Sequence, residues 1–226
     1  MPCFYITSFI NTYNKVVKIT GMQEASLPQK PKSTKAQKTR QKILEAARAI
    51  FAERGFAKAT AEEISTRAGV GYGTFYLYFT DKKQALHTIL SEVDDKLYEL
   101  GSPDVKHNVG LGALAPIKTT ISSFFESFKE NVDIIKICQE LSATDAEFKE
   151  QHDKVRARLV NRMKEHLIKG LQLGNTRQLD PEIASIALAG LIETIAIEWF
   201  FNDRDWDKTK VINTVAKLYY SAVIKG

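Results

Sequence analysis

Apolar residues recur at helical spacing along most of the chain, and segments with strand-like alternation are scarce. This pattern predicts an all-α fold. In the first expected helix, from about Ala36 to Arg54, apolar residues fall on one face at i, i+4, i+7 and i+8. Gly55 predicts the end of this helix as a left-handed cap, with Phe56 packing back on Phe51.

Capping signals predict three further elements. Thr60 and Glu63 form an S/T-x-x-E capping box ahead of a short helix that ends at Gly69. A second short helix is expected over about 72–79. Asp81 repeats the capping pattern and begins a longer amphipathic helix.

The Gly- and Pro-rich segment 101–116 predicts a domain boundary. Beyond it, helices are expected near 114–130, 132–142, 144–173, 181–202 and 207–224. The run Asp180-Pro181-Glu182 supplies a cap, a proline at the first helical position and an acid, which is a strong signal for a helix start.

The longest apolar stretch, residues 183–201, approaches the length that spans a bilayer. Glu193 and Glu198 interrupt it, and two carboxylates in lipid would be costly. We therefore expect a helix buried in protein and no membrane partner.

The net charge of +5 is placed unevenly, because from Gly101 onward 17 basic residues balance 17 acidic ones. The excess lies in the first hundred residues, where seven Lys and Arg residues between Lys30 and Arg48 face only Glu45. This asymmetry predicts an anionic partner for the first half. A merely solvated basic tail is the alternative.

The cysteines, the histidines and the absence of catalytic motifs limit the classes of function that the sequence can support. Two cysteines and no disulfide framework fit a reducing cytoplasm. No histidine stands at metal-ligand spacing, and no nucleophile elbow, phosphate loop or carboxylate pair with a base is present. We expect neither an enzyme nor a metal or cofactor site.

The first 35 residues are expected to form a flexible extension. Residues 22–35 are rich in Pro, Gln, Lys and Ser, which suits a mobile arm. The preceding stretch is neither helical in period nor typical of a signal peptide. Our hypothesis is that Met22 is the true first residue.

Two short helices around a glycine turn, over residues 60–79, predict a helix-turn-helix. Here the chain resembles the TetR family of transcriptional regulators, through "TRQKILEAARAIFAERGF" and "TAEEISTRAGVGYGTFYLYFTDKKQAL". The resemblance covers residues 37–97 and implies a three-helix DNA-binding domain joined by a fourth helix to a helical effector-binding and dimerisation domain, residues 105–226.

The resemblance also implies which residues touch double-stranded DNA. Thr60 and Lys82 match phosphate-contacting positions, and helix starts and lysines both attract phosphate. Tyr72 and Thr74 are expected at base edges. The full expected set is Lys38, Thr60, Gly71, Tyr72, Gly73, Thr74, Tyr76, Tyr78 and Lys82.

The directions of the aromatic side chains can be argued from spacing. Phe75 and Phe79 fill the inward face at i and i+4, so Tyr76 and Tyr78 should point elsewhere. The resemblance implies that their side chains reach the sugar-phosphate backbone. A core role for Tyr76 is the alternative. Gly71 and Gly73 would let the backbone approach a phosphate closely.

For the second half, the resemblance implies a small, lipophilic effector and a homodimer, with helices 181–202 and 207–224 pairing across the interface. The candidate effector-binding residues are Phe124, Phe128, Met163, Glu193 and Trp199. Plain core packing, or a salt bridge for Glu193, is the alternative for each.

The expected function is a cytoplasmic, nucleoid-associated repressor that binds a palindromic operator and is released by its effector. An activator, a ligand-independent regulator and a non-specific DNA-coating protein remain alternatives.

Overall fold

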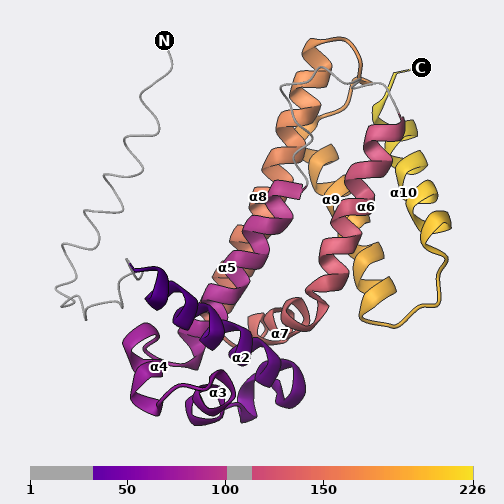
Figure 1. Cartoon of the computed structure of the whole chain (residues 1–226). Helices are drawn as coiled ribbons and strands as arrows, with labels where there is room; N and C mark the ends of the chain where they lie inside the picture. The colour runs from indigo at the N-terminus through magenta and orange to yellow at the C-terminus, as the bar shows by residue number, and fades with distance from the viewer. Residues whose placement is uncertain (1–32, 101–113, 226) are drawn as a thin grey trace, which may run out of the picture.

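The computed structural model describes residues 33–100 and 114–225, and they form an elongated, helical molecule (Figure 1). At one end lie three helices, α2 (Thr34–Lys58), α3 (Ala61–Ala68) and α4 (Tyr72–Tyr78), and α5 (Lys82–Leu100) leads from them along a bundle. The bundle also contains α6 (Leu114–Glu130), α7 (Val132–Ser142), α8 (Ala146–Gln172), α9 (Pro181–Phe200) and α10 (Lys208–Val223). The all-α prediction is confirmed for the described residues.

Two expectations fall on residues that the structure does not describe. Residues 1–32 of the expected flexible extension (1–35) are not among the described residues. The hypothesis about Met22 concerns this part of the chain alone. The expected domain boundary lies outside the described residues over 101–113.

Helix α2 is interrupted at Gly55. Its φ of 75° is positive, as expected of a glycine that stops a helix, but its ψ of 159° is extended rather than left-handed helical. One more turn then continues to Lys58. The expected contact is present, because the Phe51 and Phe56 rings lie 5.5 Å apart.

The capping predictions for α3 and α9 are confirmed. Thr60 and Glu63 make both hydrogen bonds of the capping box, and Gly69 ends α3 in the left-handed conformation. Asp180 accepts hydrogen bonds from the backbone N–H groups of Glu182 and Ile183, and Pro181 occupies the first turn of α9.

One hydrophobic core joins the three-helix unit to the bundle. Phe51 of α2 and Phe75 of α4 belong to the same buried cluster as Ile134 of α7 and Phe148 of α8. All four side chains are fully buried. The orientation of the three-helix unit is therefore tied to α7 and to the start of α8.

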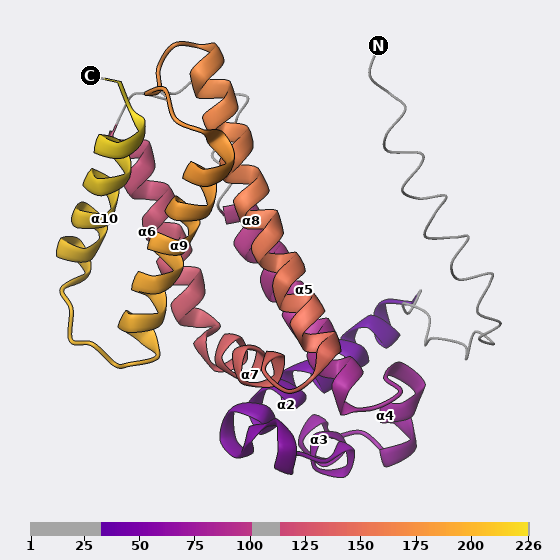
Figure 2. The same ribbon diagram turned by 180° about the vertical axis from the view of Figure 1, so that it is seen from behind.

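Helices α9 and α10 are in contact with each other, and α10 lies on the side of the bundle away from α5 (Figure 2). Leu188, Ala189, Ile192 and Ala196 of α9 are buried against neighbouring helices. Among the described helices, only α9 is long and apolar enough to cross a membrane by length and composition. The expectation of a helix buried in protein therefore holds for one stripe of α9, whereas Ile183 and Ile186 are exposed.

Candidate DNA-binding surface and ligand cavity

Helices α3 and α4 form a helix-turn-helix whose inner face is closed. Ile64, Phe75 and Phe79 are at most 1% exposed. The turn is fixed by Gly69, and the backbone N–H of Val70 donates to the Ser65 carbonyl at 3.0 Å. Because α3 and α4 share one buried core, α4 is held rigidly with its other face free.

The outer face of α4 carries Tyr72, Gly73, Tyr76 and Leu77, which recur at i, i+1, i+4 and i+5. Their exposure confirms the expected outward direction of Tyr72 and Tyr76 and leaves Gly71 and Gly73 open to a close approach. Thr74 is half-buried at the edge of this face.

Tyr72 and Tyr76 act as one unit. Their hydroxyl oxygens lie 3.0 Å apart in a hydrogen bond, and their rings meet edge to face at 5.1 Å. The hydrogen bond to Tyr72 is the main cause of a raised pKa for Tyr76. The pair presents a neutral, aromatic surface.

Tyr78 differs from the expectation. It is half-buried and packs against the hydrophobic core that the three-helix unit shares with the bundle. The outward direction expected from the Phe75 and Phe79 spacing therefore holds for Tyr76 and only in part for Tyr78. A sugar-phosphate contact by Tyr78 stays a prediction.

The two expected phosphate ligands are both engaged within the protein. The Lys82 ammonium donates to the carbonyl oxygens of Phe56, Ala57 and Ala59 at 2.8–3.0 Å. The Thr60 hydroxyl is held by the capping box with Glu63. Their phosphate contacts stay predictions, and Lys82 has a structural role that the sequence did not reveal.

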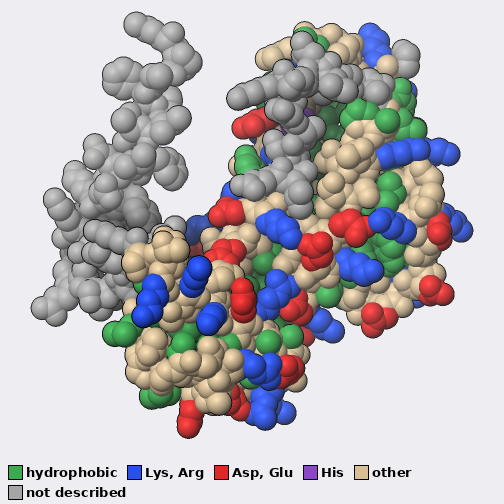
Figure 3. Space-filling view, viewed as in Figure 1, with side chains coloured by type: hydrophobic (Ala, Val, Ile, Leu, Met, Phe, Trp, Pro, Cys, Tyr) green, Lys and Arg blue, Asp and Glu red, His purple; other side chains and the backbone are tan. Residues whose placement is uncertain are grey.

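Lys38 is exposed on the first half of α2, where cationic side chains gather (Figure 3). Lys35 and Lys42 are exposed on the same half and, like Lys38, make no ion pair with any described residue. By contrast, Arg40 pairs with Glu92 and lies over the Phe79 ring. The lysines of α2 are thus the cations best placed for a polyanion.

An apolar cavity of about 350 Å³ lies in the bundle, between α5, α6, α7, α8 and α9. Val93, Leu97, Phe124, Phe128, Val155 and Leu159 are among the residues that line it. Because α5 forms one wall and continues directly from the helix-turn-helix, a molecule in this cavity would contact the helix that carries the DNA-binding unit.

The cavity includes three of the five candidate effector residues. Phe124, Phe128 and Glu193 line it. Met163 does not, because it packs into the hydrophobic clusters between α6, α9 and α10. Trp199 does not either, since its ring stacks on Phe200 and meets Phe125 on another side of the bundle.

Charged side chains from α8 line one side of this apolar cavity. Arg156 pairs with Glu193 at 3.2 Å, and Arg158 pairs with Asp94 and Asp95 of α5. Arg162 donates to the Tyr98 carbonyl, and burial lowers its pKa. The salt-bridge alternative for Glu193 is therefore confirmed.

Comparison with known proteins agrees with this geometry. The family model described as "Bacterial regulatory proteins, tetR family" matches residues 43–88, which span most of α2, all of α3 and α4, and the start of α5. The fatty acid metabolism regulator protein of Bacillus subtilis is 26% identical over 183 residues, covering 80% of this chain and 93% of that protein.

Residues 43–88 thus match the tetR family model, and the chain as a whole is similar to regulators of that family. Its fold matches the fatty acid degradation regulator FadR from Bacillus halodurans, with a TM-score of 0.69, 24% identity and coverage of 84% of this chain and 97% of that one. It also matches FadR from Bacillus subtilis in complex with stearoyl-CoA, with a TM-score of 0.67, 26% identity and coverage of 80% and 97%.

Near the three-helix unit, polar contacts join α2 and α5 to the rest of the bundle at two places, in addition to the α5–α8 ion pairs at the cavity. At the first, Arg48 of α2 donates to Asp133 and Asn131 at 2.8–3.2 Å and to the Glu130 carbonyl at 2.7 Å. Three acceptors at the α6–α7 junction therefore hold a single guanidinium.

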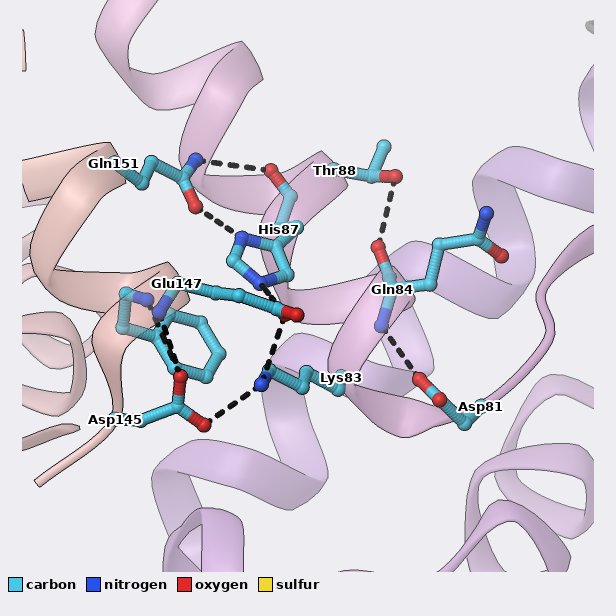
Figure 4. A network of polar contacts seen from close by, with 9 residues as sticks. Asp81, Lys83, Gln84, His87, Thr88, Asp145, Glu147 and Gln151 are labelled. Atoms are coloured by element: carbon cyan, nitrogen blue, oxygen red, sulfur yellow. Dashed lines mark hydrogen bonds and ion pairs between the residues drawn. The ribbon is translucent and has the colours of Figure 1, made fainter. Parts of the chain in front are cut away.

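The second place is the start of α8 (Figure 4). Lys83 of α5 bridges Asp145 at 2.7 Å and Glu147 at 2.9 Å. His87 stacks on Phe148 at 4.3 Å, and its ring nitrogen bonds to Gln151. The first two turns of α5 are thus bound to α8, whose later turns line the cavity.

Sequence reasoning missed several residues of this site. The cavity arginines at 156, 158 and 162 carry a readable signal, since they alternate with the apolar Val155 and Leu159 on one helix. Leu77 was also missed, although it is 74% exposed on α4. Arg48 gave no signal, because its partners lie more than 80 residues away in the chain.

Proposed function

We propose that this TetR-family regulator is a repressor that binds a palindromic operator as a homodimer and is released by a long-chain acyl thioester. The observation that carries the proposal is an apolar cavity with arginines on one side and the helix of the DNA-binding unit as a wall. The protein would act in the cytoplasm, at the nucleoid.

The chemistry of the cavity suits an amphiphile with an anionic head. Phe124, Phe128 and Leu159 offer an apolar surface for an acyl chain. Arg158 and Arg162 offer planar guanidinium groups, which suit phosphate or carboxylate oxygens. The similar FadR of Bacillus subtilis forms a complex with stearoyl-CoA, which supports this choice of ligand class.

Release of DNA would follow from differential binding. Asp94 and Tyr98 of α5 touch the cavity arginines of α8, so an anionic head group that competes for Arg158 would alter the contact between these helices. A ligand that favours one α5–α8 arrangement shifts the population toward it. The position of α4 would change with α5, and operator affinity would fall.

Dimerisation is proposed through α9 and α10. Ile183 and Ile186 of α9 are 70% and 46% exposed, and Leu218 of α10 is 52% exposed. All three belong to α9 and α10, which lie on the side of the bundle away from α5. A second copy covering this side would place two α4 helices for two half-sites of DNA.

The test is operator binding with and without ligand. DNase footprinting on the DNA that flanks the protein's own gene should show a protected palindrome, and palmitoyl-CoA or stearoyl-CoA should remove the protection. Coenzyme A without an acyl chain is the matched control. A footprint that acyl-CoA strengthens would favour an activator or co-repressor mechanism over release, and one that ignores it would exclude this ligand class.

A further inference from the structure

The outer face of α4 lacks the side chains that usually read guanine or adenine. From Gly69 to Thr80 the sequence is GVGYGTFYLYFT, which contains no Lys, Arg, His, Asn, Gln, Asp or Glu. Bidentate base recognition in the major groove uses Arg or Lys for guanine and Asn or Gln for adenine. This recognition helix therefore has to discriminate bases with hydroxyl and apolar groups.

Three cations of the neighbouring helices are engaged by other groups of the DNA-binding unit. Arg67, at the end of α3, makes two hydrogen bonds to the Glu53 carboxylate at 2.7 and 2.9 Å. Arg54 pairs with Glu63. Lys82 is engaged by three carbonyl oxygens. None of these cations lies on α4 itself.

The groups that α4 does present are methyls and a neutral aromatic pair. Leu77 is 74% exposed, more than any other exposed large hydrophobic side chain among the described residues. It lies one residue beyond Tyr76, whose hydroxyl is bonded to that of Tyr72. In Figure 3, hydrophobic side chains protrude over α4, whereas the cations gather over the first half of α2.

A scattered exposed leucine needs no explanation, but one on a recognition helix does. Thymine is the one base that presents an apolar group, its C5 methyl, in the major groove. We infer that Leu77, flanked by the Tyr72–Tyr76 pair, reads thymine methyl groups, and that the operator is specified by T·A pairs rather than by guanines. This inference rests on the proposed DNA-binding function.

The experiment has two stages. The full-length protein first selects duplexes from a random library, and the enriched sequence should place T·A pairs at the centre of each half-site. Each thymine is then replaced by deoxyuridine, which removes the methyl and keeps the base-pairing groups. Affinity should fall about fourfold for each methyl that Leu77 covers, the fold-change that corresponds to one buried methyl-sized group.

Leu77→Ala supplies the decisive comparison. The variant should bind the thymine operator about fourfold more weakly per half-site and should no longer distinguish thymine from deoxyuridine at the contacted position. Leu173→Ala removes a leucine of comparable exposure (54%) at the far end of α8 and should change neither quantity. Thermal unfolding confirms that both variants are folded.

Two results would overturn the inference while leaving the proposed function standing. One is an operator bound with full affinity after every thymine methyl is removed. The other is an operator whose affinity depends on guanine N7, tested with 7-deazaguanine, and not on thymine. If no duplex is enriched at all, the DNA-binding function itself fails and the inference fails with it.

Discussion

Lys82 links three parts of the DNA-binding unit with one ammonium group. It begins α5, and it donates to the last carbonyl groups of α2 and to Ala59, just before α3. It also lies over the Phe56 ring at 4.8 Å. A lysine whose three donors satisfy otherwise unpaired helix-end carbonyls stabilises the fold, whatever it does for DNA.

Lys82→Ala should therefore lower the free energy of unfolding by about 1–3 kcal/mol, because three carbonyl acceptors lose a charged donor. Chemical denaturation measures this. Lys38→Ala is the control, since this exposed lysine should leave stability unchanged and reduce the salt dependence of DNA binding by one phosphate contact.

The same pair of variants separates two roles of Lys82. Lys82→Ala could change the salt dependence of DNA binding as Lys38→Ala does while stability is unaffected. In that case the ammonium moves to a phosphate in the complex, and its carbonyl contacts contribute little to the free energy of unfolding. If stability falls and the salt dependence is unchanged, Lys82 positions α3 and α4 without touching DNA.

At the scale of single elements, helix boundaries and the helix-turn-helix were predictable, because caps and glycine turns are local. Thr60 with Glu63, Gly69 and Asp180 all behave as their sequence neighbours indicate. The lining of the cavity was predictable only in part. Phe124 and Trp199 are both aromatic residues on apolar helices, and tertiary packing alone decides that Phe124 lines the cavity and Trp199 does not.

The close approach of α8 to the following loop gives an element-scale prediction. A Cβ on Gly170 would lie 2.3 Å from Cγ2 of Thr176, whereas the next closest atom, Oγ1 of Thr176, lies at 3.4 Å. Gly170→Ala should destabilise the protein by about 1–3 kcal/mol through overpacking. Thr176→Ser removes the clashing methyl, so the double variant should recover most of the loss.

Thermal unfolding of the two single variants and the double variant gives the three changes in stability that a double-mutant cycle needs. Equal destabilisation of Gly170→Ala in both backgrounds would mean that the Thr176 methyl is not the cause, and that this turn differs from the geometry described.

Substitution of Arg48 tests whether its contacts couple the cavity to operator binding. It ties α2 to the α6–α7 junction through Asp133, Asn131 and the Glu130 carbonyl. Arg48→Ala should retain operator binding, because Arg48 lies away from α4, but should reduce the factor by which acyl-CoA weakens that binding. Fluorescence anisotropy with saturating palmitoyl-CoA and with none measures this factor. An unchanged factor would mean that Arg48 does not carry the coupling, which would then pass through the α5–α8 contacts and the shared hydrophobic core.

At the scale of the whole molecule, the proposed two-fold symmetry matters because one α4 would read only half of a palindromic operator. Ile186→Asp puts a charge into the proposed α9–α10 interface and should yield monomers by light scattering, with operator affinity sharply reduced. Leu173→Ala, at the far end of α8, should remain dimeric. A dimeric Ile186→Asp protein would exclude this face as the interface.

Control of the DNA-binding surface by the cavity is tested most directly by the affinity of the full-length protein for its operator, measured with stearoyl-CoA and with coenzyme A alone. We predict tight, sequence-dependent binding that stearoyl-CoA weakens at least tenfold and that coenzyme A leaves unchanged. Operator affinity that is the same in both conditions would mean that the cavity does not control the DNA-binding surface.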